Sequence, residues 1–417
     1  MLQGTMVDAG ANEQREERLV VCFASNGSGP GYDSRSQMSG MSGKRIRALD
    51  ATRGTAMLFV LISHFGLTYF GRNGQDHLED WFERVGKVAS PTFMVLSGMM
   101  AGFLYAARRE SFRATRMRLA DRGLFFLTVG HLVIAVAHLP RFGRLDFALY
   151  EVYITDTIAF CIIAGPFLVE ALGSRARLAL GAALFAASWA ALDLWPVHWH
   201  LWWRAALVGE LVPEPTYRVS IYTFPVLPWF AAYLASTSLG EAFAARLKRD
   251  GQIAAARLIL HVGGASVLIA IVCAKAAAFA REAAWIAPDH LLTTLASLSC
   301  KRPPGPVYLI FHAGLGLLLL AAMMTVEHLG RLDTWLQFTT RLGRTSFFIF
   351  VLQFFVFNAF FYSARLPMSP VWPLYFAATV VFVGLASWWW DAGGYNRFMT
   401  MRILRGQTAP DERRRTA

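Results

Sequence analysis

Two residues able to do chemistry stand on one apolar segment near the start of the chain. In RIRALDATRGTAMLFVLISHF, residues 45–65, His64 follows Arg53 after eleven positions. At about 1.5 Å per helical residue, the two lie about 16 Å apart along a helix. A guanidinium group binds phosphate or carboxylate oxygens, and an imidazole exchanges protons near neutral pH. The pair therefore indicates an anion-binding group at the edge of an apolar segment and a proton-transfer group inside it.

Each residue also has a plainer interpretation. A histidine inside a membrane can hydrogen-bond a neighbouring helix, and an arginine directly before Gly54 can anchor a helix at the interface. As a catalytic base, His64 would need a partner that fixes its tautomer. Asp156, in VYITDTIAF, is the best carboxylate candidate, although it could instead be a cap or an interfacial residue.

Further histidines and arginines could serve the same site. His131 and His138 are seven residues apart, nearly on one helix face, so they either line a cavity or take packing and interfacial positions. Residues 112–122, FRATRMRLADR, place much of their positive charge on one helix face. Such a face would bind the phosphates of an anionic ligand, or would set topology and meet anionic lipid. Its arginines are Arg113, Arg116, Arg118 and Arg122.

Two polar segments follow later in the chain. Lys301 and Arg302 precede two prolines, a pattern that predicts non-helical backbone dipping toward a cavity, with Arg302 as a further residue that could bind an anion. Residues 195–218 are rich in Trp and His, which suits either sugar binding or an interfacial aromatic belt. His198 and His200 alternate as metal ligands could, but no third ligand is near, and the four cysteines have no metal-ligand spacing. The sequence predicts no metal site.

Membrane helices must position these side chains. Of the 417 residues, 55% are hydrophobic, the mean hydropathy is +0.40, and long apolar runs recur. The runs are continuous rather than alternating, so helices rather than a barrel would satisfy the backbone in a membrane. We predict an all-α polytopic membrane protein with about ten transmembrane helices. The expected spans lie near 51–70, 88–107, 122–140, 152–172, 177–195, 221–239, 255–275, 305–326, 345–363 and 370–390.

The distribution of charge predicts the orientation. The segments 44–53 and 108–122 and the chain from 391 onward are basic, whereas the connection 71–87 is slightly acidic. Because Lys and Arg accumulate in cytoplasmic loops, both termini are expected in the cytoplasm. The net charge of +12 then reflects topology and not nucleic-acid binding. We expect a disordered cytoplasmic tail over 1–43, a transmembrane domain over 44–395 and a basic cytoplasmic tail over 396–417.

Five stretches resemble one superfamily, in the same order along the chain. The opening RALDATRG with Arg53 and His64 is similar to the first helix of the integral membrane acyltransferases. These comprise the acyltransferase-3 family and the heparan-alpha-glucosaminide N-acetyltransferase-like proteins. In departure from them, Arg302 stands where the heparan branch has Tyr, and Gln353 where many relatives have His. The later stretches are ASPTFMVLSGMMAGF (89–103), FPVLPWFAAYLA (224–235), SCKRPPGPVYL (299–309) and LGRTSFFIFVLQ (342–353).

This resemblance implies that the transmembrane domain is an acyltransferase of the bacterial inner membrane. The donor would be acyl-CoA, such as acetyl-CoA, and the acceptor a hydroxyl or amine of an envelope glycan, glycolipid or small glycoside. His64 would act as general base or as covalent acyl carrier, with Asp156 as a helper. The expected partners are membrane lipid and the carbohydrate acceptor, and a homo-oligomer is left open. The candidate donor ligands are Arg53, Arg113, Arg116, Arg118 and Arg302.

Two other functions remain open at this point. In a proton-coupled transporter or exporter, His64 and Asp156 would relay protons. The two halves of the chain show no internal repeat, which disfavours an inverted-repeat transporter. In a non-catalytic subunit of an envelope-assembly complex, replacing His64 would have no effect.

Overall fold

The computed structural model describes residues 46–143, 145, 149, 151–195, 201–209, 224–287, 291–301, 303–364 and 366–401. Helices make up nearly all of this part of the chain. It contains no named strand, only an isolated bridge between Lys301 and Pro304. The predicted tail 1–43 and nearly all of 396–417 lie outside the described residues.

The all-α polytopic architecture is confirmed. Within the described ranges, seven helices are long and apolar enough to cross a membrane, or eight if a bent helix pair forms one span. The bent pair joins Asp333–Arg344 to Ser346–Tyr362 at an angle of 73°. The seven are Arg47–Asn73, Asp76–Ala107, Phe112–Arg141, Ile154–Ala171, Val226–Glu282, Pro306–Leu329 and Trp372–Ala392.

The expected number of transmembrane helices, about ten, is higher than this count. The described part of every expected span lies on a helix, but two expected spans share α11 (Val226–Glu282), which counts once. Gly251 divides α11 into two helices, with a non-helical φ of 83° and ψ of −177°. In addition, α9 (Ser174–Leu194) is not among the counted helices.

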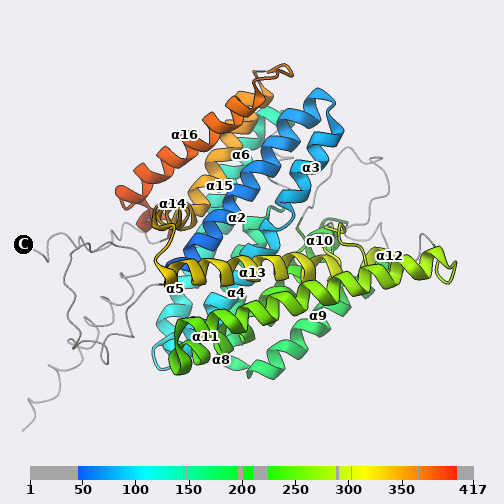
Figure 1. Cartoon of the computed structure of the whole chain (residues 1–417), viewed down its shortest axis with the longest axis vertical. Coiled ribbons are helices and arrows are strands. Elements are labelled where there is room, and N and C mark those ends of the chain that lie inside the picture. Colours follow the sequence, from blue (N-terminus) through cyan, green and yellow to red (C-terminus); the bar gives the residue numbers. More distant parts are fainter. Residues whose placement is uncertain are drawn as a thin grey trace, which may run out of the picture.

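The helices form two groups in Figure 1. In the upper part α2, α3, α6, α15 and α16 lie together, while α9, α11 and α13 cross the lower part, where α11 packs along α13. The remaining bounds are α2 (Arg47–Phe65), α3 (Asp76–Gly86), α4 (Ala89–Ala107), α5 (Phe112–Phe125), α6 (His131–Phe142), α8 (Ile154–Ala171), α10 (Leu201–Leu207), α12 (Leu291–Leu295), α13 (Pro306–Leu329), α14 (Asp333–Arg344), α15 (Ser346–Phe354) and α16 (Trp372–Ala392).

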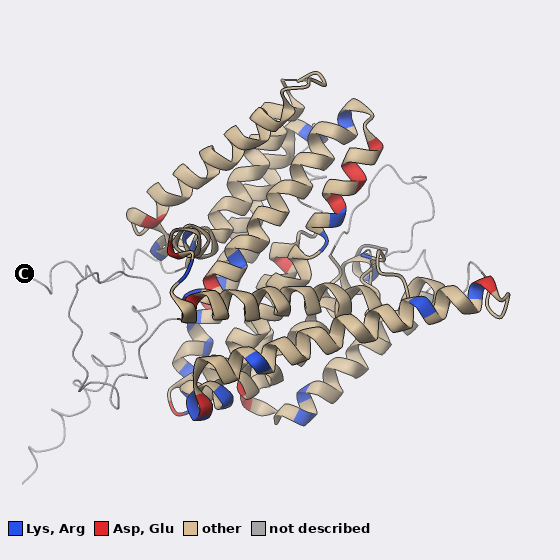
Figure 2. Ribbon diagram, in the orientation of Figure 1, with Lys and Arg blue, Asp and Glu red and all other residues tan. Residues whose placement is uncertain are grey.

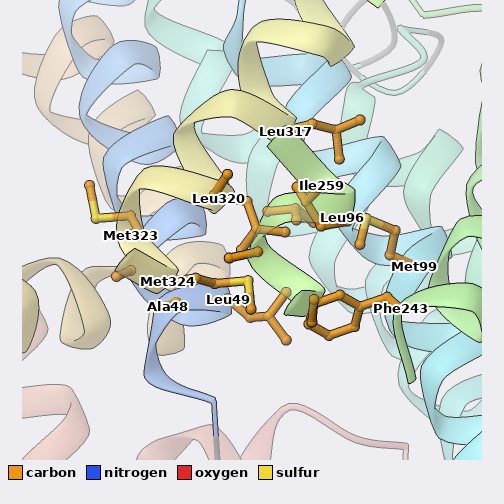
Figure 3. Packing of buried hydrophobic residues seen from close by; sticks show 14 of the residues in the cluster. Ala48, Leu49, Leu96, Met99, Phe243, Ile259, Leu317, Leu320, Met323 and Met324 are labelled. Atoms are coloured by element: carbon orange, nitrogen blue, oxygen red, sulfur yellow. The ribbon is translucent and has the colours of Figure 1, made fainter. Parts of the chain in front are cut away.

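An apolar cluster fixes the start of α2, the helix that holds Arg53 and His64. Leu49 of α2 packs with Met99 of α4, Phe243 and Ile259 of α11 and Leu320 of α13 (Figure 3). The cluster includes residues on both sides of the break at Gly251. Four helices distant in sequence therefore meet at the first turns of α2.

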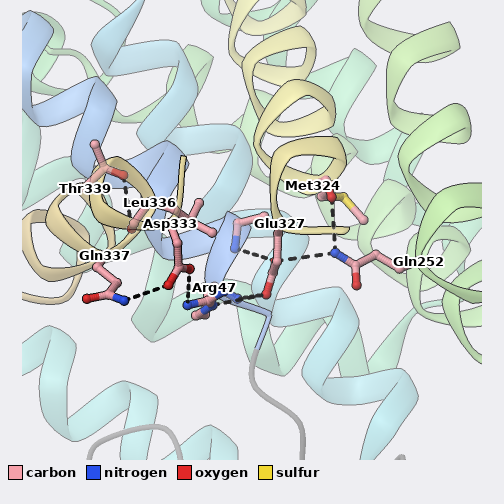
Figure 4. Close-up of polar contacts among 9 residues, drawn as sticks. Arg47, Gln252, Met324, Glu327, Asp333, Leu336, Gln337 and Thr339 are labelled. Carbon is pink, nitrogen blue, oxygen red and sulfur yellow. Dashed lines mark hydrogen bonds and ion pairs between the residues drawn. The ribbon is translucent and has the colours of Figure 1, made fainter. Parts of the chain in front are cut away.

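A carboxylate from the far end of α13 caps α2. The backbone N–H groups of Arg47 and Ala48 donate to Glu327 at 3.1 and 2.9 Å (Figure 4). The Arg47 guanidinium also pairs with Asp333 of α14 at 3.1 Å, and the Gln252 amide donates to Glu327 at 3.4 Å. A carboxylate at a helix N-terminus satisfies otherwise unpaired donors and complements the helix dipole. Glu327 thus ties α2 to α13.

Two glycines let α14 cross α2 in backbone contact. A β-carbon on Gly54 would overlap the Thr339 carbonyl, and one on Gly343 would overlap the Asp50 carbonyl. Only glycine allows such an approach. This crossing brings the start of α15, directly after α14, next to Arg53.

Candidate functional site

A cavity of about 420 Å³ lies inside the bundle and contains the two residues from which the sequence argument started. Arg53 and His64 both line it from α2. Most of the remaining wall comes from α3, α4, α5, α6, α8 and α15. Three π-helical turns of the described chain also face it: η1 (Gly66–Phe70), η3 (Phe126–Gly130) and η4 (Phe355–Tyr362). Such turns are rare and occur preferentially at functional sites.

One end of the cavity is positively charged, and we call it the arginine end: Arg53, Arg122 and Ser346. The Arg53 guanidinium donates a hydrogen bond to the Ser346 hydroxyl at 3.0 Å. Arg122 comes from α5, close enough to Arg53 for the two charges to repel, and lies 5.3 Å from the Phe126 ring. Among the described residues, no acidic side chain forms an ion pair with Arg122. Two guanidinium groups sharing a cavity away from bulk water favour a bound anion.

His64 lies farther along the same cavity, within an aromatic wall. Its ring centroid is 5.1 Å from that of Phe354 and 6.4 Å from those of Phe350 and Phe357. Its Nδ1 atom is buried and has no hydrogen-bond partner among the described residues. Gln353 is a neighbour, with both amide atoms buried and likewise without partners in the described part of the chain. The imidazole therefore lines the cavity with its Nδ1 atom unpaired within the described residues, and Gln353 lies beside the ring.

The other end, which we call the glutamate end, is formed by Glu79, Glu83, Glu151, Arg141 and Lys301. All five side chains line the cavity. Glu79 and Glu83 are on α3, where Figure 2 shows acidic residues gathered. The other three come from the end of α6, the residues just before α8 and the segment before α13. This end thus has charge of both signs.

The packing of α3 on α2 shows that the two ends are far apart. Gly86 lies against Ser63, and Glu79 lies against Gly71, so α3 runs back along the second half of α2. Gly71 is eighteen residues beyond Arg53, a distance of about 27 Å along a helix. His64 falls between the two ends, eleven residues from Arg53. One cavity therefore joins an anion-binding end to a mixed-charge end past a single imidazole.

Asp156 takes a different partner from the one expected. Its Oδ2 atom lies 2.9 Å from Nδ1 of His131 and accepts a hydrogen bond from the Tyr153 backbone at 2.8 Å, which closes a capping box at the start of α8. Neither Asp156 nor His131 lines the cavity, whereas His138 does. The observed contacts match the alternative in which Asp156 caps its own helix.

Tyr153 is a neutral polar group on the cavity wall. Burial, together with the nearby carboxylates of Glu151 and Asp156, raises the pKa of Tyr153 well above its usual range. The phenol therefore stays protonated at neutral pH. Its ring lies 5.1 Å from that of His138.

Only one arginine of the 112–122 segment reaches the cavity. Arg113 and Arg118 are not part of the wall, and Arg116 pairs with Glu170 while its guanidinium lies 4.4 Å from the Phe167 ring. Arg122, one turn deeper in the apolar helix, is the residue that lines the cavity. Arg302 lies outside the described residues, but its neighbour Lys301 is placed at the glutamate end, 5.7 Å from the Phe224 ring.

Several functional candidates were missed by the sequence argument. Ser346 follows α14 in the LGRTS motif, and its role depends on the bend of 73° before α15. Glu79 and Glu83 were assigned to a slightly acidic connection, but their spacing of four residues on a helix was the available signal. His198 and His200 lie outside the described residues, within which no group of three potential ligands could hold a metal.

Comparison with known proteins identifies the family. The family model described as heparan-alpha-glucosaminide N-acetyltransferase, catalytic, matches residues 45–274, more than half of the 417-residue chain. The matched region includes Arg53, His64, Glu79, Glu83 and Arg122. No curated protein and no solved structure matches the chain. The chain therefore belongs to the heparan-alpha-glucosaminide N-acetyltransferase catalytic family, and with its apolar helices it is a multi-pass membrane acetyltransferase.

Proposed function

We propose that the protein transfers an acetyl or other short acyl group from acyl-CoA, bound at the arginine end, to a hydroxyl or amine at the glutamate end. The observation that supports this most strongly is the shared cavity: Arg53, Arg122 and His64 line one continuous space that reaches Glu79 and Glu83. Family membership supplies the reaction class, and the cavity suggests how its two substrates are kept apart.

The arginine end suits the phosphate groups of a coenzyme A thioester. The charges of Arg53 and Arg122 repel one another, a bound anion would reduce that repulsion, and guanidinium groups match phosphate oxygens in geometry. Ser346 already holds Arg53 through a hydrogen bond of 3.0 Å, which reduces the freedom that binding would otherwise remove. These three residues are the donor ligands that we propose.

His64 then acts where donor and acceptor meet. As base, its imidazole removes the proton of the acceptor while the acceptor oxygen or nitrogen attacks the thioester carbonyl. The new C–O or C–N bond forms, the C–S bond breaks, and the departing thiolate takes up the proton. In the covalent variant, the imidazole first accepts the acyl group and then passes it to the acceptor. Both routes need a ring nitrogen that is not held by the protein, and Nδ1 has no hydrogen-bond partner within the described residues.

The acceptor that we propose is a carbohydrate: an envelope glycan, a glycolipid or a small glycoside. The basic segments near the arginine end favour a cytoplasmic position for that end, and the glutamate end then opens toward the opposite side. A bacterial inner membrane is the setting in which such an acceptor meets a cytoplasmic thioester. The acyl group would cross the bilayer while coenzyme A stays behind.

Acetyl transfer by the detergent-purified protein tests the proposal. Radiolabelled acetyl-CoA is added with a glycoside acceptor, and label is followed into product and into hydrolysed acetate. Wild type is compared with His64→Ala and with His328→Ala, because His328 is exposed at the end of α13, outside the cavity wall. We expect the turnover of the wild type and of His328→Ala to match, and that of His64→Ala to fall by at least about a hundredfold. Equal turnover in all three proteins contradicts the role of His64, and acceptor flux without acyl turnover supports an exporter.

A further inference from the structure

Gln353 of α15 lies beside the His64 ring and outside the cavity wall. Phe350 and Phe354, two of the rings that contact His64, stand three positions before it and one position after it. Positions i, i+3 and i+4 share one face of a helix, so Gln353 is directed toward α2 together with these two rings. Gln353 is also fully buried, with 0% of its surface exposed. It therefore faces the imidazole from within the protein and not from the cavity.

The two side chains have complementary hydrogen-bonding groups. Nδ1 of His64 is buried and has no hydrogen-bond partner within the described residues, and the same holds for both amide atoms of Gln353. Buried polar atoms are nearly always hydrogen-bonded, and an unpaired one costs stability. An amide has an oxygen that accepts and an NH2 group that donates, so it can bond Nδ1 with or without its proton. Each side chain is thus suited to be the partner of the other.

Burial leaves one edge of the His64 ring for the cavity. Nδ1 is shielded, but the residue as a whole is half-buried and lines the cavity, so the edge that contains Nε2 faces the open space. Proton transfer or acyl attachment in the cavity then uses the lone pair of Nε2. In a neutral imidazole this requires the ring proton to be on Nδ1.

The bundle fixes this tautomer in a second cavity histidine by a backbone bond. Nδ1 of His138 donates to the Ile134 carbonyl at 2.9 Å, because a carbonyl oxygen can only accept. In neutral His138 the lone pair is therefore on Nε2. Nδ1 of His64 has no such bond within the described residues, and Asp156, the carboxylate expected as its partner, bonds His131 instead. The group that holds the proton on Nδ1 of His64 must come from elsewhere.

We propose that Gln353 is the positioning residue of His64: its amide oxygen accepts a hydrogen bond from Nδ1–H and so keeps the lone pair on Nε2, toward the cavity. This inference rests on the proposed function, because it deepens the role assigned to His64 there. The proton stays on Nδ1 in both routes, while Nε2 takes up either the acceptor proton or the acyl group. The amide is neutral, so it orients the ring without the charge pair that a carboxylate would form with an imidazolium.

Replacing Gln353 by Met and by Glu tests the proposal. Met has a similar length and no strong hydrogen-bonding group, whereas Glu keeps an oxygen acceptor and adds a charge. Gln337→Met is the matched control, because Gln337 is an exposed residue of α14 outside the cavity wall. The charged or titratable groups that act on the His64 ring stay unchanged in all variants: Lys301, His138 and Arg141.

Three measurements are made on each full-length protein in detergent. Thermal unfolding gives Tm, and acetyl transfer from labelled acetyl-CoA gives kcat and both KM values as a function of pH. Labelling by diethyl pyrocarbonate, followed by mass spectrometry of the His64 peptide, gives the pH midpoint at which the ring loses its second proton. This last measurement requires no acyl transfer.

We expect Gln353→Met to lower kcat by at least about tenfold with both KM values and Tm close to those of the wild type, because the tautomer is lost while the fold is kept. In Gln353→Glu the carboxylate stabilises the imidazolium. The labelling midpoint and the acid limb of kcat/KM should therefore move up by about one pH unit or more. Gln337→Met should behave as wild type.

An unchanged kcat in Gln353→Met overturns the proposal, as does a fall in kcat that accompanies a large loss of Tm, since that is the result of a purely structural role. An unshifted labelling midpoint in Gln353→Glu overturns it as well. A wild type that transfers no acetyl group, together with a shifted midpoint in Gln353→Glu, counts against the proposed function and supports the positioning of His64 by Gln353.

Discussion

The two ends of the cavity are built in different ways. At the arginine end, α14 touches the backbone of α2, Thr345 bonds Ser387 at 2.6 Å, and Arg344 pairs with Asp391 at 3.0 Å. The glutamate end is formed by the short helix α3 and by the segment before α13. That segment is held to α13 by a hydrogen bond of 3.1 Å between the Leu298 carbonyl and Nε2 of His312. In the proposed function, rigid backbone contact holds the donor in one position, whereas a short helix and a loop form the acceptor end.

The largest effect is expected from disturbing the packing at the arginine end. In Gly343→Val, the new side chain overlaps the Asp50 carbonyl, so α14 must move away from α2. We expect a loss of about 3 kcal/mol or more in the free energy of unfolding, or no folded protein. Thermal unfolding in detergent measures this. Gly384→Val is the matched control, because there the nearest atom to an added β-carbon is 3.3 Å away, on the Phe338 ring. Equal loss in both variants would contradict the packing argument.

Removing the charge of Arg122 should affect the donor and not the acceptor. A guanidinium–phosphate contact contributes about 1.5–3 kcal/mol, so we expect Arg122→Ala to raise KM for acetyl-CoA by about 10- to 100-fold. Arg116→Ala should change it by less than about threefold, because Arg116 pairs with Glu170 outside the cavity wall. Steady-state kinetics with each substrate varied separately distinguishes the two. An equal rise for both variants would assign the donor phosphates to the basic segment as a whole.

A change in the segment before α13 should affect binding of the acceptor and not of the donor. His312→Ala removes the hydrogen bond to Leu298 and loosens the chain that presents Lys301. We expect KM for the acceptor to rise by about fivefold, the value of a hydrogen bond of about 1 kcal/mol, with KM for acetyl-CoA unchanged. A rise in KM for acetyl-CoA instead would show that this segment serves the donor.

The reactivity of Cys300 gives the smallest and most local test of the glutamate end. Burial raises the pKa of the Cys300 thiol, so at pH 8 a smaller fraction is thiolate than in a free cysteine. Alkylation by iodoacetamide should therefore be slower in the folded protein than in the denatured one, and it should accelerate as the pH rises above 8. Mass spectrometry of the Cys300 peptide measures the rate. A rate equal to that of the denatured protein would show that the segment before α13 is open.

Sequence alone was enough to predict what depends on a single helix. The separation of Arg53 and His64 follows from helix geometry, and the positions of the apolar spans follow from hydropathy, including the two expected spans that α11 joins across Gly251. What could not be predicted depends on how helices meet. Arg122, and not Arg113 or Arg118, lines the cavity because of the depth and the rotation of α5 in the bundle. Asp156 contacts His131 because α6 lies against the start of α8.

The bend before Ser346 has a similar origin. The sequence predicts one span over 345–363, but the position of α14 across α2 requires the particular pairing of Gly54 with Thr339 and of Gly343 with Asp50. Glycines are common in apolar helices, and nothing local marks these two as a contact. Long-range contact of this kind is what turns an expected interfacial arginine into a cavity residue.

Transfer across a sealed membrane tests the central claim most directly. The protein is reconstituted in liposomes with an alkyl glucosaminide trapped inside and labelled acetyl-CoA only outside. A cavity that joins both ends past His64 predicts labelled glycoside inside the vesicles with the wild type and none with His64→Ala, while coenzyme A remains outside. Product that forms only when donor and acceptor share one side of the membrane would contradict it.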